Sequence, residues 1–99
     1  MSIIERNIDG IILLCHAHAV EQLSVFGSVL TDRFNDKSDI DFLVRFGSVP
    51  VESYADNYLQ FSVSLGELLG REIDLVEDKA IRNPVFRNNV DRTKVQIYG

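Results

Sequence analysis

Helix-like and strand-like patterns alternate along this chain, and their order limits the fold more than any other feature. Apolar residues recur at helical spacing over Ile3–Val20 and over Glu52–Leu69. Four short runs are typical of strands: Gln22–Phe26, Asp39–Phe46, Glu72–Glu77 and Lys94–Tyr98. A chain of 99 residues has room for one core. The order therefore predicts a single α/β (α+β) domain over residues 1–99, with a mixed sheet of about four strands and helices packed against it.

Shorter segments complete this order. A short helix is expected from Ser28, ending in the polar stretch at residues 35–38, and another over Lys79–Asn83, stopped by Pro84. A further helix would run through Val90. The apolar stripes of the two long helices are expected to form the core: Ile4, Ile8, Ile11, Ile12, Cys15 and Ala19 in the first, and Tyr54, Tyr58, Phe61, Leu65, Leu68 and Leu69 in the second.

Charge, hydropathy and cysteine content narrow the class of protein. The net charge is −5, and Lys and Arg are scattered, which disfavours binding to a nucleic-acid backbone. No apolar run approaches the roughly 18 residues of a membrane span. A single cysteine, Cys15, cannot form an intramolecular disulfide and suits a buried thiol in a reducing cytoplasm. We therefore expect a cytoplasmic protein without a membrane segment.

Five residues carry a pattern that suggests phosphate chemistry. Gly27 allows a sharp turn after a strand and close approach to a phosphate, and Ser28 adds a hydroxyl at the start of a helix. Asp39 and Asp41 lie two apart on the expected strand, so both carboxylates would project from one face. Asp74, in another strand, can supply a third carboxylate. Such carboxylates can chelate Mg²⁺, which is usually shared with substrate phosphates.

A purely structural origin for these residues is hard to justify. Aspartate disfavours strands, and three aspartates inside strand patterns contradict the local rules of sheet formation. Contradictions of this kind are typical of functional sites. A Gly-Ser pair alone means nothing, since Gly47-Ser48 repeats it without an Asp-x-Asp behind it. The complete spacing predicts a metal-dependent site.

The pattern resembles the signature of a known superfamily. Phe26-Gly27-Ser28, ten residues, and then Ser38-Asp39-Ile40-Asp41-Phe42-Leu43-Val44 are similar to the polymerase-beta-like nucleotidyltransferases, and most similar to the minimal nucleotidyltransferase (MNT) group. The resemblance continues through residues 72–76 and 82–99. It implies transfer of a nucleoside monophosphate, most naturally AMP from ATP, to an acceptor hydroxyl.

The resemblance also implies roles for individual residues. Asp39 and Asp41 would hold two Mg²⁺ ions, or two Mn²⁺ ions in their place, and Asp74 would complete the metal site and help deprotonate the acceptor. Gly27 and Ser28 would hold the β and γ phosphates of the triphosphate. Many relatives carry a basic residue directly after Gly-Ser, where this chain has Val29.

Three basic residues are candidates to contact the nucleotide. Arg33 and Lys37 follow the Gly-Ser pair and could meet the triphosphate in place of the missing basic residue, whereas Arg82, before Asn83-Pro84, could reach the nucleotide from elsewhere in the chain. The sequence does not distinguish among them.

Members of the MNT group often act as antitoxins beside a HEPN-type toxin, and some adenylylate the toxin on a tyrosine. The resemblance therefore implies a protein adenylyltransferase whose acceptor is such a tyrosine, working in a homo- or hetero-oligomer. Two alternatives remain open: a non-catalytic antitoxin that neutralises its partner by binding, and an enzyme that modifies a small molecule as aminoglycoside nucleotidyltransferases do. The base preference, the acceptor and the oligomeric state are left undetermined.

Overall fold

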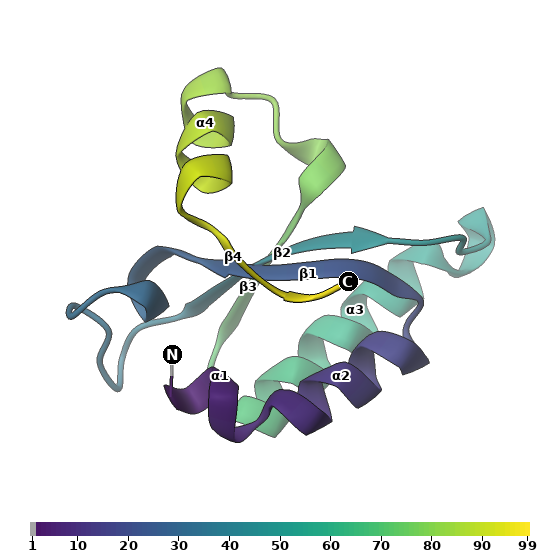
Figure 1. The fold of residues 1–99 in the computed structure, drawn as a ribbon. Coiled ribbons are helices and arrows are strands. Elements are labelled where there is room, and N and C mark those ends of the chain that lie inside the picture. The colour runs from purple at the N-terminus through teal and green to yellow at the C-terminus, as the bar shows by residue number, and fades with distance from the viewer. Residues whose placement is uncertain (1) are drawn as a thin grey trace.

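The computed structural model describes residues 2–99 and confirms an α/β domain built on one mixed sheet (Figure 1). In chain order the helices, strands and 3-10 turns are α1 (Ser2–Arg6), α2 (Ile8–Ala17), β1 (Val20–Phe26), η1 (Gly27–Leu30), β2 (Ile40–Phe46), α3 (Val51–Leu69), β3 (Ile73–Glu77), η2 (Asp78–Ala80), α4 (Pro84–Thr93) and β4 (Val95–Tyr98). Most bounds lie within one or two residues of the expected ones. No helix in residues 2–99 is long and apolar enough to cross a bilayer.

The four strands lie in the order β3-β2-β1-β4. β1 pairs antiparallel with both β2 and β4, whereas β2 and β3 run parallel and are joined by α3 as a crossover helix. The parallel register places Asp41 opposite Asp74. β3 is an edge strand of the sheet.

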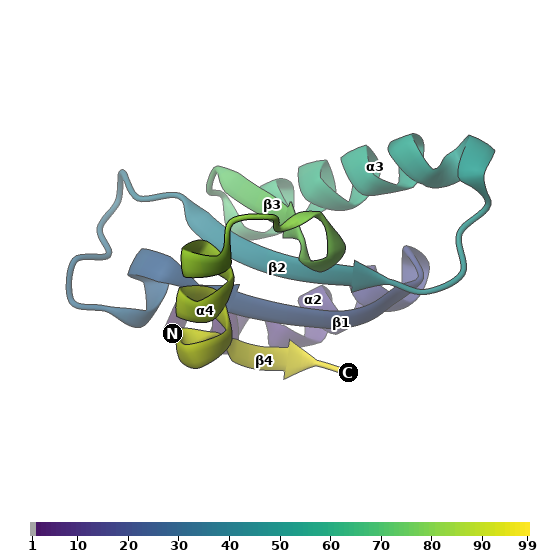
Figure 2. The same cartoon turned by 90° about the horizontal axis from the view of Figure 1, so that it is seen from above.

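Helices cover the two faces of the sheet unequally (Figures 1 and 2). α1, α2 and α3 cover one face and enclose the main core, which includes Ile11, Phe42 and Phe61. α4 covers part of the other face, over a smaller cluster of Phe26, Leu43 and Val90. Because neighbouring residues of a strand point to opposite faces, Asp41 lies on the α4 side, next to that cluster.

The aromatic stripe of α3 packs against the core, as expected. Phe61 is fully buried, and Tyr58 packs on the core while its hydroxyl donates to the Leu75 carbonyl. Tyr54 lies farther out and donates to Glu77 at 2.9 Å. These bonds attach the crossover helix to β3, the strand that carries Asp74.

The single helix expected over Ile3–Val20 is wrong: the structure has two helices broken at Asn7. The Asn7 side chain donates to the Ile3 carbonyl at 2.8 Å, a local bond that competes with continuation of the helix. At the far end, Ala19 has a φ of 57°, which ends the helical path and turns the chain into β1. Ala19 is therefore exposed rather than part of the core.

Two expectations about short helices also need correction. Ser28 lies inside η1, a four-residue 3-10 turn that begins at Gly27, so it does not open an α-helix. The helix expected over Lys79–Asn83 is the shorter η2, and Pro84 begins α4 instead of stopping a helix. Asn83 caps α4 by accepting hydrogen bonds from the next two amides, with Pro84 in the first turn, where its missing N–H costs nothing.

Candidate active site

Three carboxylates meet where β2 and β3 begin. Asp41 is the second residue of β2 and lies opposite Asp74 of β3. Asp39 lies just before β2, whereas the sequence had suggested a position inside that strand. Its negative charge still acts on Asp41, together with that of Asp74. The structure therefore brings together all three predicted aspartates, with Asp39 and Asp74 exposed and Asp41 half-buried.

Gly27 contacts the central carboxylate directly. Its φ is +78°, in the left-handed region that side chains rarely adopt. A Cβ at this position would lie 2.3 Å from Asp41 Oδ2, well inside van der Waals contact. Only glycine satisfies both conditions, so the turn after β1 places backbone, rather than a side chain, against the carboxylates.

The Asp41 carboxyl resists ionisation. Burial is the largest cause, followed by the negative charges of Asp74 and Asp39 and a hydrogen bond with Asp74, and together they raise the pKa of Asp41 to about 6. Near neutral pH these carboxylates repel one another. A divalent cation would remove that repulsion, so the site is electrostatically suited to one.

Replacing Asp41 by asparagine should stabilise the metal-free protein in a pH-dependent way. The native carboxyl has a higher pKa than in the unfolded chain, so wild-type stability falls as pH rises from about 4 to above 6. At pH 8, Asp41→Asn should gain about 1–2 kcal/mol, a value reduced for solvent screening of a partly exposed group. Urea denaturation in EDTA from pH 4 to 8 measures the difference. A difference that does not change with pH would contradict the proposed repulsion.

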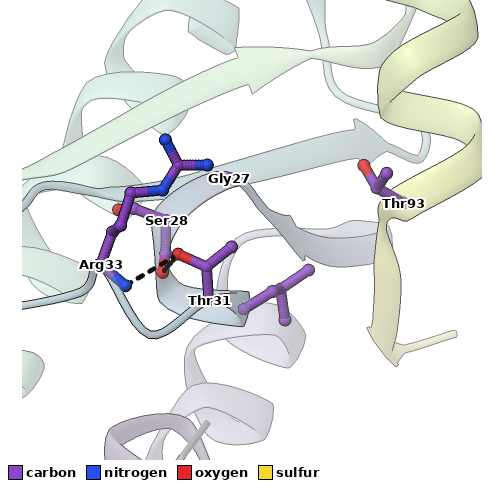
Figure 3. Close-up of a pocket in the computed structure, with 6 residues that line it drawn as sticks. Gly27, Ser28, Thr31, Arg33 and Thr93 are labelled. Carbon is purple, nitrogen blue, oxygen red and sulfur yellow. Dashed lines mark hydrogen bonds between the residues drawn. The ribbon is translucent and has the colours of Figure 1, made fainter.

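A pocket of about 680 Å³ lies at Gly27, the residue whose backbone approaches Asp41 (Figure 3). It is lined by Gly27, Ser28, Leu30, Thr31, Arg33 and Thr93. The Thr31 hydroxyl donates to the Ser28 carbonyl at 2.9 Å and accepts from the Arg33 amide at 3.2 Å, which fixes the pocket wall. A volume of this size is within the usual range of small-molecule sites.

The three basic candidates occupy different places. Arg33 lines the pocket beside Gly27 and Ser28, and among residues 2–99 its guanidinium makes no hydrogen bond or ion pair. Lys37 lines a separate hollow with Asp39 and Arg71. Arg82 donates to the Lys79 carbonyl at 2.7 Å and lines neither hollow. Of the three, Arg33 is the one that lines the pocket at Gly27.

The donor set suits a hard cation. Carboxylate oxygens are the ligands that Mg²⁺ prefers in proteins, and the three aspartates supply them at one edge of the sheet. Within residues 2–99, however, no three His, Cys, Asp or Glu side chains are already grouped as a metal site. Asp41 and Asp74 instead lie opposite each other in the parallel register of β2 and β3. Binding would require exposed Asp39 and Asp74 to turn toward the ion.

Sequence reasoning missed three pocket residues and one anchoring residue. Leu30, Thr31 and Thr93 line the pocket, Thr93 from the end of α4 on the far side (Figure 3). Arg71 contacts the loop before Asp39. None of them belongs to the Gly-Ser or Asp-x-Asp pattern, so spacing alone gave no signal for them.

Comparison with known proteins establishes the family. The protein-family model described as "Polymerase beta, Nucleotidyltransferase" matches residues 10–99. The chain belongs to this nucleotidyltransferase family. A protein of Methanocaldococcus jannaschii named "Putative protein adenylyltransferase MJ0128" is 32% identical over 88 residues, which cover 86% of this chain and 84% of the relative.

Solved structures of nucleotidyltransferases share the fold. One described as "Structure of putative minimal nucleotidyltransferase" superposes with a TM-score of 0.76 at 26% identity, covering 93% of this chain and 90% of the other. Another, described as a tri-AMPylated Shewanella oneidensis HEPN toxin in complex with MNT antitoxin, gives 0.66 at 22% identity, with coverage of 96% and 71%. The minimal nucleotidyltransferase fold expected from the sequence is confirmed.

Proposed function

We propose that this nucleotidyltransferase moves AMP from ATP to a tyrosine hydroxyl of a HEPN-type toxin partner and thereby acts as an antitoxin. The observation that carries the chemistry is that Asp39 and Asp74 lie near enough to Asp41 to act on its charge, beside the Gly27 turn. The names of the relatives support the acceptor class: the Methanocaldococcus jannaschii relative is named as a protein adenylyltransferase, and the Shewanella oneidensis structure contains an AMPylated HEPN toxin.

In this proposal the pocket binds the triphosphate, and the carboxylates bind the metal ions. The triphosphate would lie at η1, with its β and γ phosphates against the Gly27 and Ser28 backbone and Arg33 supplying positive charge. Asp39 and Asp41 would hold two Mg²⁺ ions, or Mn²⁺ in their place, with Asp74 as a further ligand. Bound there, such ions neutralise charge on the phosphates and favour loss of the acceptor proton.

The transfer itself needs an accessible acceptor site. Asp74 is exposed on the edge strand β3, so a tyrosine of another protein can reach it. The tyrosine oxygen forms a bond to the α-phosphorus, the bond from that phosphorus to the bridging oxygen breaks, and pyrophosphate leaves. The phenolic proton passes to Asp74, which acts as general base.

Labelling the partner tests the acceptor. The purified chain, incubated with Mg²⁺, ATP labelled on the α-phosphate and the product of the gene adjacent to its own, should place one or more AMP groups on that protein. Replacing the acceptor tyrosine by phenylalanine should remove the label, whereas Asp39→Asn in this chain should prevent it. Label on a small molecule or RNA instead would refute the proposed acceptor and leave the family unchanged.

A toxin-neutralisation assay in cells separates catalysis from simple binding. If Asp39→Asn still neutralises the toxin in cells as well as wild type does, complex formation alone is sufficient and the transfer is dispensable. We expect the variant to lose neutralisation, because the three carboxylates have no evident structural purpose: they repel one another at neutral pH.

A further inference from the structure

One arginine holds the loop that joins the pocket to the first aspartate. Arg71 Nη2 lies 2.5 Å from the carbonyl oxygens of both Asn35 and Ser38 and donates to them. Its guanidinium carbon lies 4.4 Å from the centre of the Phe34 ring, stacked over it. Among residues 2–99, Arg71 is the only side chain from outside residues 31–39 that hydrogen-bonds to this loop.

These contacts are made next to Asp39. The Ser38 carbonyl belongs to the peptide group that links Ser38 to Asp39, so holding that oxygen fixes the peptide plane from which Asp39 departs. Asp39 itself precedes β2, and the first backbone bond in this part of the sheet is made by Ile40 to Glu72 at 3.1 Å. The sheet therefore does not orient Asp39 as it orients Asp41.

Arg71 is anchored to a rigid element. It follows the C-terminal end of α3, where Gly70 adopts a left-handed φ of 65° and the Arg71 amide donates to the Gly66 carbonyl at 3.2 Å. Within the described residues its guanidinium forms no ion pair, although Asp36 and Glu72 line the same hollow. The guanidinium instead donates to backbone carbonyls, to which a charged donor bonds more strongly than a neutral one.

We propose that Arg71 is a positioning residue: by fixing the Ser38–Asp39 peptide, it holds the backbone from which the Asp39 carboxylate turns to the metal. This inference rests on the proposed function, in which Asp39 is a metal ligand. It acts as the supporting contacts around metal ligands generally do, because a ligand on an unsupported loop must be ordered each time the ion binds.

Two measurements on Arg71→Ala test the role. In the metal-free protein, amide hydrogen exchange over residues 31–39 should become faster. With ATP present, Mn²⁺ affinity, followed by loss of the free-ion signal in electron paramagnetic resonance, should fall about 10- to 100-fold. Arg71→Lys keeps the charge but loses the planar guanidinium and its stacking on Phe34. Its Mn²⁺ affinity should therefore lie between those of wild type and Arg71→Ala.

Arg45→Ala is the matched control. Arg45 lies at the far end of β2, where it pairs with Glu21 at 2.8 Å on the surface, so its loss should leave Mn²⁺ affinity unchanged. Unchanged affinity in Arg71→Ala would overturn the inference even if exchange became faster. Should that variant fail to fold, unchanged affinity in Arg71→Lys would overturn it equally. A wild-type protein that binds no Mn²⁺ with ATP would overturn the proposed function, and this inference with it.

Discussion

Asp39→Asn combined with Asp41→Asn is expected to abolish nucleotidyl transfer and stabilisation by Mg²⁺ with ATP, while the protein stays folded. Asparagine has nearly the same size but cannot hold a divalent ion by charge. Stabilisation of charge at the reacting phosphate is the main contribution to this chemistry, so transfer should fall by at least about a thousandfold. Without metal, the variant should unfold no earlier than wild type, because it lacks the repulsion that raises the pKa of Asp41.

Thermal unfolding gives a readout that does not require the acceptor. ATP at about 100 times its Kd stabilises a protein by about 2.7 kcal/mol, which raises the Tm of a domain of this size by roughly 10–20 °C. Wild type should show this rise with Mg²⁺ or Mn²⁺, and the double variant should not. Asp9→Asn with Asp56→Asn makes the same change in charge on exposed positions of α2 and α3 and should behave as wild type. An equal rise in the Asp39/Asp41 variant would remove the metal-site assignment.

Gly27→Val should eliminate ATP binding and cost about 2–4 kcal/mol of stability. The backbone at Gly27 has a φ of +78°, which a β-branched residue adopts only under strain, and its Cβ would meet Asp41 Oδ2 at 2.3 Å. The added methyl groups would also fill the approach to the pocket. Calorimetric titration with ATP and Mg²⁺ measures the binding, and urea denaturation measures the stability.

Two milder variants separate the causes of this loss. Gly70→Ala places a Cβ on another left-handed residue with no atom within 4 Å, so it should cost about 1 kcal/mol of stability and leave ATP binding intact. Ser28→Ala removes one hydroxyl and should weaken ATP binding by roughly 1–2 kcal/mol. Normal ATP affinity in Gly27→Val would show that the η1 turn does not hold the phosphates.

Features set by periodicity could be predicted from the sequence, and features set by single local bonds could not. Period-two alternation placed Asp41 on a strand, and the third strand pattern placed Asp74 beside it, because both strands bury apolar neighbours in a fixed register. The break at Asn7 depends on one side-chain bond, which helical spacing does not reveal. The start of α4 was readable in principle, since Asn followed by Pro is a common way to begin a helix.

The loop over residues 31–39 shows why the site was only partly predictable. It has no periodic pattern, so the sequence could not say that Arg33 faces the pocket while Lys37 faces a different hollow. The sequence did not point to Arg71 because this residue binds backbone carbonyls. Every residue has a backbone carbonyl, so such a contact leaves no sequence motif. The raised pKa of Asp41 likewise depends on burial and on three-dimensional distance.

The parallel pairing of β2 with β3 has a consequence for how the protein folds. β1, η1 and β2 are close in sequence, so their antiparallel pair can form early and already contains Gly27, Ser28, Asp39 and Asp41. Asp74 joins them only after α3 has closed a long crossover, which is entropically slow. A chain in which only the first pair has formed would lack the third carboxylate, so under the proposed function we expect it to be inactive. Activity would then be gained late in folding, at the step in which the crossover helix docks.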